Sequence, residues 1–127
     1  MKKIIYTKNA PDPIGPYNQA ILSNNTLYIS GQIALDAATG KLIEGTIKEE
    51  TTKCLENLKA ILNAADMTFE NVVKSSIFLK DMYQFAEVNL IYSNYFKAET
   101  APARETIEVA NLPKFVNVEI SMIAIME

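Results

Sequence analysis

The chain has 127 residues, of which 49% are hydrophobic and 21% are charged, a composition typical of a globular protein with one domain over residues 1–127. Its net charge is −3 and its lysines are spread among acidic residues, so the basic surface that nucleic-acid binding requires is missing. The absence of histidine excludes Ser-His and Cys-His nucleophiles, imidazole proton shuttles and zinc sites built on His.

The N-terminal residues predict a short strand, Ile4–Tyr6, and no targeting segment. Its apolar run is broken at Lys8, which leaves it too short for a signal peptide or a membrane span. We therefore expect a cytoplasmic protein with no membrane partner. The stretch Pro11–Pro16 follows, and its prolines favour a shaped loop over a helix or a central strand.

Two strands are expected next, Gln19–Ser23 and Thr26–Ser30. The pair Asn24-Asn25 between them tolerates the positive φ of a tight hairpin turn. Gly31 follows directly, and a glycine at a strand end indicates either a bulge or turn, or a place where a ligand approaches the backbone. The segment Asp36–Gly45 is rich in turn residues.

A long helix is predicted after that segment. Thr46 and Glu49 have the spacing of a capping box, and apolar residues recur with helical period through about Ala65. Cys54 belongs to this apolar stripe and is the only cysteine, which excludes an intrachain disulfide. We interpret Cys54 as a small core residue in preference to a reactive thiol.

The second half of the chain predicts three more strands, with a second helix after the first of them. Val72–Lys80 has the pattern of a strand, and Asp81, with Gln84 three residues later, is expected to cap a second amphipathic helix reaching Phe96. Its aromatic residues recur at helical spacing and are interpreted as core. Two closing strands follow, Arg104–Val109 and Val116–Met126.

These elements predict an α+β fold with a single mixed sheet of five to six strands and two helices on one face. The last strand carries apolar residues on both of its faces, so the face without helices also needs cover. Contact between the sheets of identical subunits would supply it, which favours a closed cyclic homo-oligomer.

Glu119 is expected on that second face. Period-two alternation places Asn117, Glu119 and Ser121 together, opposite the face that the helices cover. A carboxylate without a partner on an apolar sheet is costly, so Glu119 needs a cation, water or a cleft. The residues leave two interpretations open: a glutamate in a salt bridge at the rim, or a positioned base.

Arg104 has the features of an anion receptor. Pro102 fixes its own φ and keeps Ala101 out of helical conformation, so the guanidinium would be presented from a stiff junction between loop and strand. Its planar fork of donors suits a carboxylate. The alternative is an ordinary exposed arginine. Tyr17, at the end of the proline-rich loop, could likewise offer its phenol to an anion or simply be packed.

Four segments occur together in one order and spacing: Gly15-Pro16-Tyr17, Ile29-Ser30-Gly31-Gln32, Pro102-Ala103-Arg104 and, fifteen residues later, Glu119. With them the chain resembles the Rid (YjgF) family of reactive intermediate deaminases, over about Lys3 to Ile125, and looks most similar to its RidA subgroup. The resemblance implies a chorismate-mutase-like α+β fold and a homotrimer with clefts between subunits. It also implies hydrolysis of 2-imino acids to 2-keto acids and ammonia with no cofactor and no metal.

The resemblance also assigns roles to individual residues. Arg104 would hold the substrate carboxylate, and Glu119 would orient the attacking water. Further pocket positions would be Tyr17, Ser30, Gly31, Asn89 and Thr106. Thr106 stands where many RidA members have cysteine. Because the role implied for that position is mainly a backbone contact, activity is expected to survive, whereas regulation through a cysteine is put in doubt.

The function expected from sequence is therefore that of a 2-iminobutanoate/2-iminopropanoate deaminase acting on reactive imino and enamine acids released by pyridoxal-phosphate dehydratases. An alternative is a regulatory module that binds 2-keto acids without significant turnover, for which Arg104 alone would suffice. The RNA-cleaving activity attributed to some relatives is poorly supported, because neutralising phosphates needs a basic surface.

Overall fold

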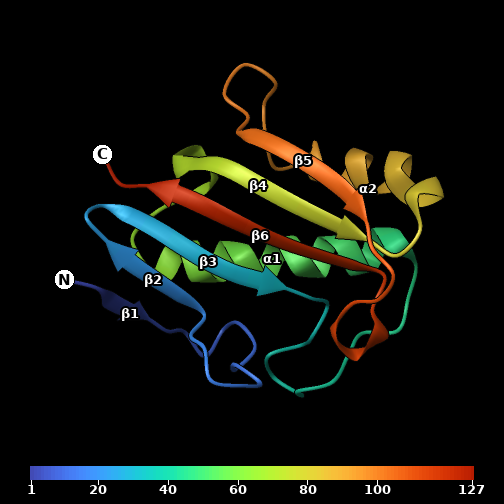
Figure 1. Ribbon diagram of the computed structural model, residues 1–127, viewed down its shortest axis with the longest axis horizontal. Helices are drawn as coiled ribbons and strands as arrows, with labels where there is room; N and C mark the ends of the chain where they lie inside the picture. Colours follow the sequence, from blue (N-terminus) through green and yellow to red (C-terminus); the bar gives the residue numbers. More distant parts are fainter.

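A computed structural model describes residues 1–127 as one six-stranded sheet with two helices across one face (Figure 1). The strands are β1 (Lys3–Ile5), β2 (Ala20–Ser23), β3 (Thr26–Gln32), β4 (Val72–Leu79), β5 (Ala103–Glu108) and β6 (Val118–Ile125), and the helices are α1 (Ile47–Ala64) and α2 (Phe85–Tyr92). Single turns of 3-10 helix span Phe69–Asn71, Met82–Gln84 and Pro113–Phe115. The α+β class and the single mixed sheet are thereby confirmed.

The strands are arranged in the order β1-β2-β3-β6-β4-β5. All neighbouring pairs are antiparallel except β4 and β5, which are parallel because the chain crosses over through α2 between them. The C-terminal strand β6 therefore lies in the middle of the sheet, while β1 and β5 form its edges (Figure 1).

The main core lies between the sheet and the helices. The apolar stripe predicted for the long helix is buried, with Leu55, Leu58 and Ile61 fully enclosed, and Cys54 is buried beside them as expected. Along β6, buried residues alternate strictly with partly exposed ones from Val118 onward. This alternation confirms that one face of the sheet packs on the helices and that the other is open.

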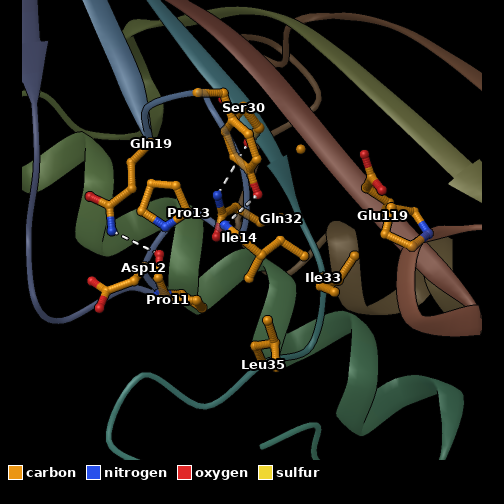
Figure 2. Close-up of a pocket in the computed structure, with 13 residues that line it drawn as sticks. Pro11, Asp12, Pro13, Ile14, Gln19, Ser30, Gln32, Ile33, Leu35 and Glu119 are labelled. Atoms are coloured by element: carbon orange, nitrogen blue, oxygen red, sulfur yellow. Dashed lines mark hydrogen bonds between the residues drawn. The ribbon is translucent and has the colours of Figure 1, made fainter. Parts of the chain in front are cut away.

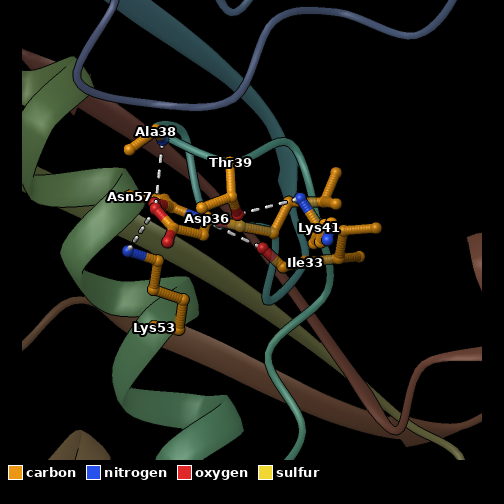
Figure 3. A network of polar contacts seen from close by, with 8 residues as sticks. Ile33, Asp36, Ala38, Thr39, Lys41, Lys53 and Asn57 are labelled. Atoms are coloured by element: carbon orange, nitrogen blue, oxygen red, sulfur yellow. Dashed lines mark hydrogen bonds and ion pairs between the residues drawn. The ribbon is translucent and has the colours of Figure 1, made fainter.

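The segment after β3 is fixed to α1 by polar side chains (Figure 3). The side chain of Asn57, buried on α1, donates to the carbonyl oxygens of Ile33 and Leu35 at 3.1 and 3.0 Å. Lys53, one turn earlier, forms an ion pair of 3.8 Å with Asp36, whose carboxylate also accepts from the amide of Ala38 at 3.1 Å. The turn-rich segment is thus a defined extension of the core.

Some predicted boundaries were wrong. The first strand is Lys3–Ile5, and Tyr6 has already left the sheet, donating its hydroxyl to Asp12 at 2.6 Å. The second helix is much shorter than predicted. Asp81 caps a 3-10 turn by accepting from the amide of Tyr83, and α2 ends at Tyr92. Phe96 lies beyond the helix but still packs on the core, because its ring stacks on Tyr92 with centroids 4.6 Å apart.

The start of β6 also differs from the prediction. Val116 and Asn117 precede the strand, and Val116 joins a small separate cluster that contains Ile33 and Leu112. Asn117 does not lie on the open face with Glu119 as expected. Its amide nitrogen and side chain donate to the buried Glu50 of α1 at 2.8 and 2.9 Å, so the helix holds the residue just before the strand.

Apolar side chains gather on the open face of the sheet. The strand registers align Ile4, Ile21, Tyr28 and Ile123 across four strands, and Ile4 and Tyr28 are more than half exposed, at 56% and 51%. That copies of the chain cover this face remains a prediction.

Neither helix combines the length and the apolar character that crossing a bilayer requires.

The capping box predicted for α1 is present and offers a test of this fold. The side chain of Thr46 accepts from the amide of Glu49 at 3.2 Å, and the carboxylate of Glu49 accepts from the amide of Thr46 at 2.8 Å. We predict that Thr46→Ala lowers the free energy of unfolding by about 1 kcal/mol, because the amide of Glu49 loses the hydroxyl oxygen that accepts its hydrogen bond. Urea denaturation at fixed protein concentration measures this loss, and Lys48→Ala, at an exposed position of the same turn, is the matched control. Equal midpoints for Thr46→Ala and wild type would contradict the prediction.

Candidate active site

A cavity of about 360 Å³ lies where the proline-rich loop meets the ends of β3 and β6 (Figure 2). Four of the residues assigned from sequence line it: Tyr17, Ser30, Gly31 and Glu119. Much of the remaining wall is apolar, formed by prolines of the loop together with Ile14, Ile33 and Leu35. The cavity is thus an apolar space with a few polar groups at its side, as in small-molecule sites.

The loop owes its shape to Gln19, a buried residue at the entrance to β2. Its side-chain nitrogen donates to the carbonyl oxygens of Thr7 and Pro11, each at 2.9 Å, and its side-chain oxygen accepts from the amide of Thr7 at 2.8 Å. Prolines offer carbonyls but no amide donors, so the loop needs donors from elsewhere. Sequence reasoning placed Gln19 only at the start of a strand, and no local signal would have revealed this role.

Tyr17 closes the loop on itself beside the cavity, and Ser30 of β3 fastens the end of the loop to the sheet. The Tyr17 hydroxyl accepts from the amide of Ile14 at 3.2 Å, which closes the turn of the loop and leaves its own proton free to donate. The Ser30 hydroxyl donates to the carbonyl of Asn18 at 2.6 Å. Both side chains therefore have structural partners as well as a position at the cavity.

Glu119 lies against Gly31 in the neighbouring strand. The pairing of β3 with β6 shifts register between Ile29 and Gln32, so Gly31 sits in a bulge. A Cβ atom at position 31 would overlap the Glu119 carboxylate. The bulge expected at Gly31 is therefore confirmed, and the side chain that approaches its backbone is that of Glu119. Approach of a ligand at Gly31 stays a prediction.

The Glu119 carboxylate is half-buried and has neither an ion-pair nor a hydrogen-bond partner within the chain. Burial raises the pKa of this carboxyl above its ordinary value. Within the chain, the salt bridge considered from sequence is absent. Asp12 also lines the cavity, whereas no lysine or arginine does.

Arg104 lies on the other face of the sheet. In the parallel pairing of β4 with β5 it is opposite Ser75, whose hydroxyl is bonded to Tyr92 of α2 at 2.8 Å on the helix-covered side. Glu119 is opposite Phe78, an odd number of residues along β4 from Ser75, and therefore points away from the helices. Within one chain, Arg104 and Glu119 cannot meet.

The guanidinium of Arg104, the only arginine in the chain, rests on aromatic rings. Its central carbon is 4.8 Å from the centre of the Tyr92 ring and 5.7 Å from that of Phe85. No carboxylate lies within ion-pair distance. Asn89 lies on α2, between Phe85 and Tyr92 in the sequence, and is exposed. Thr106 lies two residues after Arg104, on the same face of β5. Its hydroxyl is buried and has no hydrogen-bond partner.

The structure thus divides the residues assigned from sequence into two groups. The group at the cavity is Tyr17, Ser30, Gly31 and Glu119, and the group between β5 and α2 is Asn89, Arg104 and Thr106. The first group holds the carboxylate expected to orient water, and the second holds the arginine expected to bind the substrate.

Nowhere in the structure do three or more Asp, Glu or Cys side chains come together as they would around a metal ion.

Comparison with known proteins identifies the family. The family model described as Endoribonuclease L-PSP matches residues 7–126. A RutC family protein of Pyrococcus horikoshii is 50% identical over 127 residues, covering all of both chains. The human protein named 2-iminobutanoate/2-iminopropanoate deaminase is 46% identical over 125 residues, covering 98% of this chain and 90% of the human one.

A solved structure agrees with these relatives. The structure of YyfA from Yersinia pestis, described as a protein of the conserved Rid family, has a TM-score of 0.96 and 46% sequence identity, and the match covers 99% of this chain and 100% of that one. The family model matches nearly the whole chain, the relatives share about half of its residues, and the solved structure has the same fold. This chain belongs to the Rid (YjgF) family, the family of the Endoribonuclease L-PSP model.

Proposed function

We propose that this protein is a hydrolytic deaminase that converts 2-imino acids, and the enamines from which they form, into 2-keto acids and ammonia. The enamines would be released by pyridoxal-phosphate dehydratases. One observation carries the proposal: Glu119 presents a half-buried carboxylate without a partner to an apolar cavity, and burial raises its pKa. Such a group is suited to accept a proton from water. The name of the human relative supports the same reaction.

The complete site would combine two subunits. The cavity contains Asp12 and Glu119 and no cation, so alone it would repel a substrate that carries a carboxylate. Arg104 has an unpaired guanidinium but lies on the opposite face of the sheet. In a closed ring, the partner subunit's Arg104 can face the cavity of its neighbour. We infer a homotrimer with one such site at each interface, and the apolar open face of the sheet supports such an assembly.

The reaction then needs few groups. A bidentate pair between the substrate carboxylate and Arg104 would fix the position of the adjacent imine carbon. Glu119 accepts a proton from a water molecule as its oxygen adds to that carbon. That proton passes to the nitrogen, which becomes the amino group of a carbinolamine. The hydroxyl proton of this intermediate then passes to the same nitrogen, the carbon–nitrogen bond breaks as ammonia leaves, and the carbon–oxygen double bond of the keto acid forms. General-base help of this kind supplies about 10²- to 10⁴-fold, which is appropriate for an intermediate that already hydrolyses spontaneously.

The cavity also suits the rest of such a substrate. Ile14, Ile33 and Leu35 offer an apolar wall to a short alkyl side chain. Asn57 holds Ile33 and Leu35 in place through their carbonyl oxygens, so this wall is part of the core and is not a mobile loop. An acid with a small apolar side chain can therefore be enclosed without rearrangement of the fold.

The first prediction from this proposal separates an enzyme from a binding module. A serine/threonine dehydratase generates 2-aminoacrylate or 2-aminocrotonate, and keto-acid release is followed with and without this protein. We expect acceleration by wild type, nearly complete loss with Arg104→Ala and partial recovery with Arg104→Lys, which keeps the charge but not the planar fork. Glu119→Gln should reduce hydrolysis by roughly 10²-fold or more while keeping keto-acid affinity within about several-fold of wild type.

Glu70→Gln, at an exposed glutamate without a side-chain partner, is the matched control and should behave as wild type. Equal losses of binding and turnover in Glu119→Gln would make Glu119 a binding or structural residue. Keto-acid binding without turnover by wild type would favour the regulatory module over the enzyme.

The second prediction tests the division of the site between subunits. We expect little activity from Arg104→Ala protein or from Glu119→Gln protein alone. When the two proteins are mixed and exchange subunits, some interfaces combine the intact Glu119 of an Arg104→Ala subunit with the intact Arg104 of a Glu119→Gln subunit. With random assembly of equal amounts, about a quarter of the wild-type sites should be restored. No recovery despite proven exchange would contradict a site divided between subunits, and a stable monomer in sedimentation equilibrium would remove the shared site altogether.

The third prediction concerns stability and pH. In the folded protein the pKa of Glu119 is raised by burial, so between its ordinary and its raised pKa the folded state binds more protons than the unfolded state. The free energy of unfolding therefore falls as the pH rises through that interval. Glu119→Gln cannot ionise and should be more stable than wild type at pH 7, with the difference shrinking below the ordinary pKa.

Glu105 on β5 provides the opposite case. Hydrogen bonds from Ser76 and Lys74 lower its pKa, so the ionised form stabilises the folded state above the ordinary pKa, and this contribution is lost as the pH falls through the lowered value. Glu105→Gln should therefore be less stable than wild type at pH 7. Thermal unfolding of both variants from acid to neutral pH measures the two signs, and a destabilised Glu119→Gln at pH 7 would contradict the burial argument.

A further inference from the structure

The environment of Arg104 is unusual because its charge is balanced by no acidic residue. The guanidinium is half-buried, yet its neighbours are the faces of Tyr92 and Phe85, at 4.8 and 5.7 Å, with no carboxylate in ion-pair range. Both distances fall within the range of cation–π attraction. Arginines are mostly exposed and are rarely buried without a partner, so the contact of this guanidinium with rings alone requires a physical explanation.

The Tyr92 ring is a rigid support. Its residue is only 6% exposed, its hydroxyl is bonded to Ser75 of β4 at 2.8 Å, and the ring of Phe96 stacks on it at an interplanar angle of 28°. Phe96 is itself held edge-on by Phe69 at 5.1 Å. The ring cannot turn without breaking a buried hydrogen bond and a stack.

The Phe85 ring forms the outer part of the same support. It lies at the first residue of α2 and is 38% exposed, so it shields one side of the guanidinium from solvent without being part of the central core. Tyr92 and Phe85 are separated by seven residues, two helical turns, and therefore lie on the same side of α2. The helix thus presents two rings to one side chain of β5.

Rings and carboxylates hold a guanidinium in different ways. A carboxylate occupies the planar N–H fork and would have to be displaced by an incoming anion, whereas a ring contacts the flat face and leaves the donors at the edge available. Burial also raises the pKa of Tyr92, so its phenol stays neutral and adds no competing negative charge. The rings can therefore orient the cation without competing for its ligand.

We propose that Tyr92 and Phe85 are positioning residues that hold the plane of the Arg104 guanidinium, so that its hydrogen-bonding edge is preorganised for the carboxylate of the substrate. This inference rests on the proposed function, because it gives the rings a purpose only if Arg104 binds a carboxylate. Phe85 is the residue to vary, since it can lose its ring without opening the core. Loss of one cation–π contact should weaken carboxylate binding by roughly 3- to 10-fold.

The first measurement needs no activity. Because the chain has a single arginine, protein labelled with ¹⁵N-arginine gives one guanidinium Nε–H signal. We expect this signal to be displaced from that of free arginine by the rings, to move toward it in Phe85→Leu, and to stay displaced in Phe85→Trp. Tyr83→Leu is the matched control, because Tyr83 is an aromatic of the same segment that is 97% exposed. A wild-type signal at the free position, or one that Phe85→Leu leaves unchanged, would overturn the stack.

The second measurement is a double-mutant cycle on the dissociation constant of 2-oxobutanoate, a stable keto acid. Phe85→Leu should weaken binding by roughly 3- to 10-fold, Phe85→Trp should restore it, and Phe85→Leu should have no further effect when Arg104 is already alanine. An equal effect of Phe85→Leu with and without Arg104 would show a merely structural role and overturn the positioning.

The cycle also separates this inference from the function on which it rests. If Arg104→Ala weakens binding but Phe85→Leu does not, the positioning is wrong and the carboxylate site stands. If Arg104→Ala leaves binding unchanged, the carboxylate site of the proposed function fails, and the positioning fails with it even when the guanidinium signal shows the stack.

Discussion

The alternation of side chains along β6 is the constraint on which the other features depend. The C-terminal strand is inserted between β3 and β4, so its backbone is hydrogen-bonded on both sides and its register cannot slip. Val118, Ile120 and Met122 then face the helices and form the centre of the core. The same alternation turns Glu119 to the open face, where only the missing side chain of Gly31 leaves room for its carboxylate. Packing of the core and exposure of the candidate base are therefore set by one strand.

The molecule carries two half-buried charged groups without ionic partners, one on each side of the sheet. Glu119 is half-buried beside a cavity, and desolvation alone raises its pKa. Arg104 is half-buried on aromatic rings. Each arrangement costs stability within a single chain, because charge is removed from water without an ion pair to offset the loss. Both costs are explained if the two groups serve one ligand that is bound between subunits. Arg104 would then pair with the carboxylate of the ligand, and Glu119 would bind the attacking water.

Buried polar side chains give this site its rigidity. Gln19 supplies the donors and the acceptor that the proline-rich loop lacks, and Asn57 holds the segment after β3 to α1. Glu50 of the same helix accepts two hydrogen bonds from Asn117, two residues before Glu119. Because each of these groups is buried and satisfied, the loop, the cavity wall and the start of β6 are fixed to the same core.

Local and periodic features were determined by the sequence. The capping box at Thr46, the buried stripe of α1 and the face on which Glu119 lies follow from interactions between residues a few positions apart or from strict alternation. The early end of α2 was missed because aromatic residues beyond Tyr92 continue the helical spacing while packing on the core as a loop. The family resemblance supplied the residues of the candidate site but not their arrangement.

Only the tertiary structure decided that arrangement. Glu50 and Asn117 are 67 positions apart, and Arg104 and Glu119 belong to strands whose order in the sheet no local pattern specifies. The parallel pairing of β4 with β5 turns Arg104 toward α2, whereas the antiparallel pairing of β4 with β6 turns Glu119 away from it. Which face a strand residue occupies relative to another strand depends on the register between them, and that register is set by packing of the whole chain.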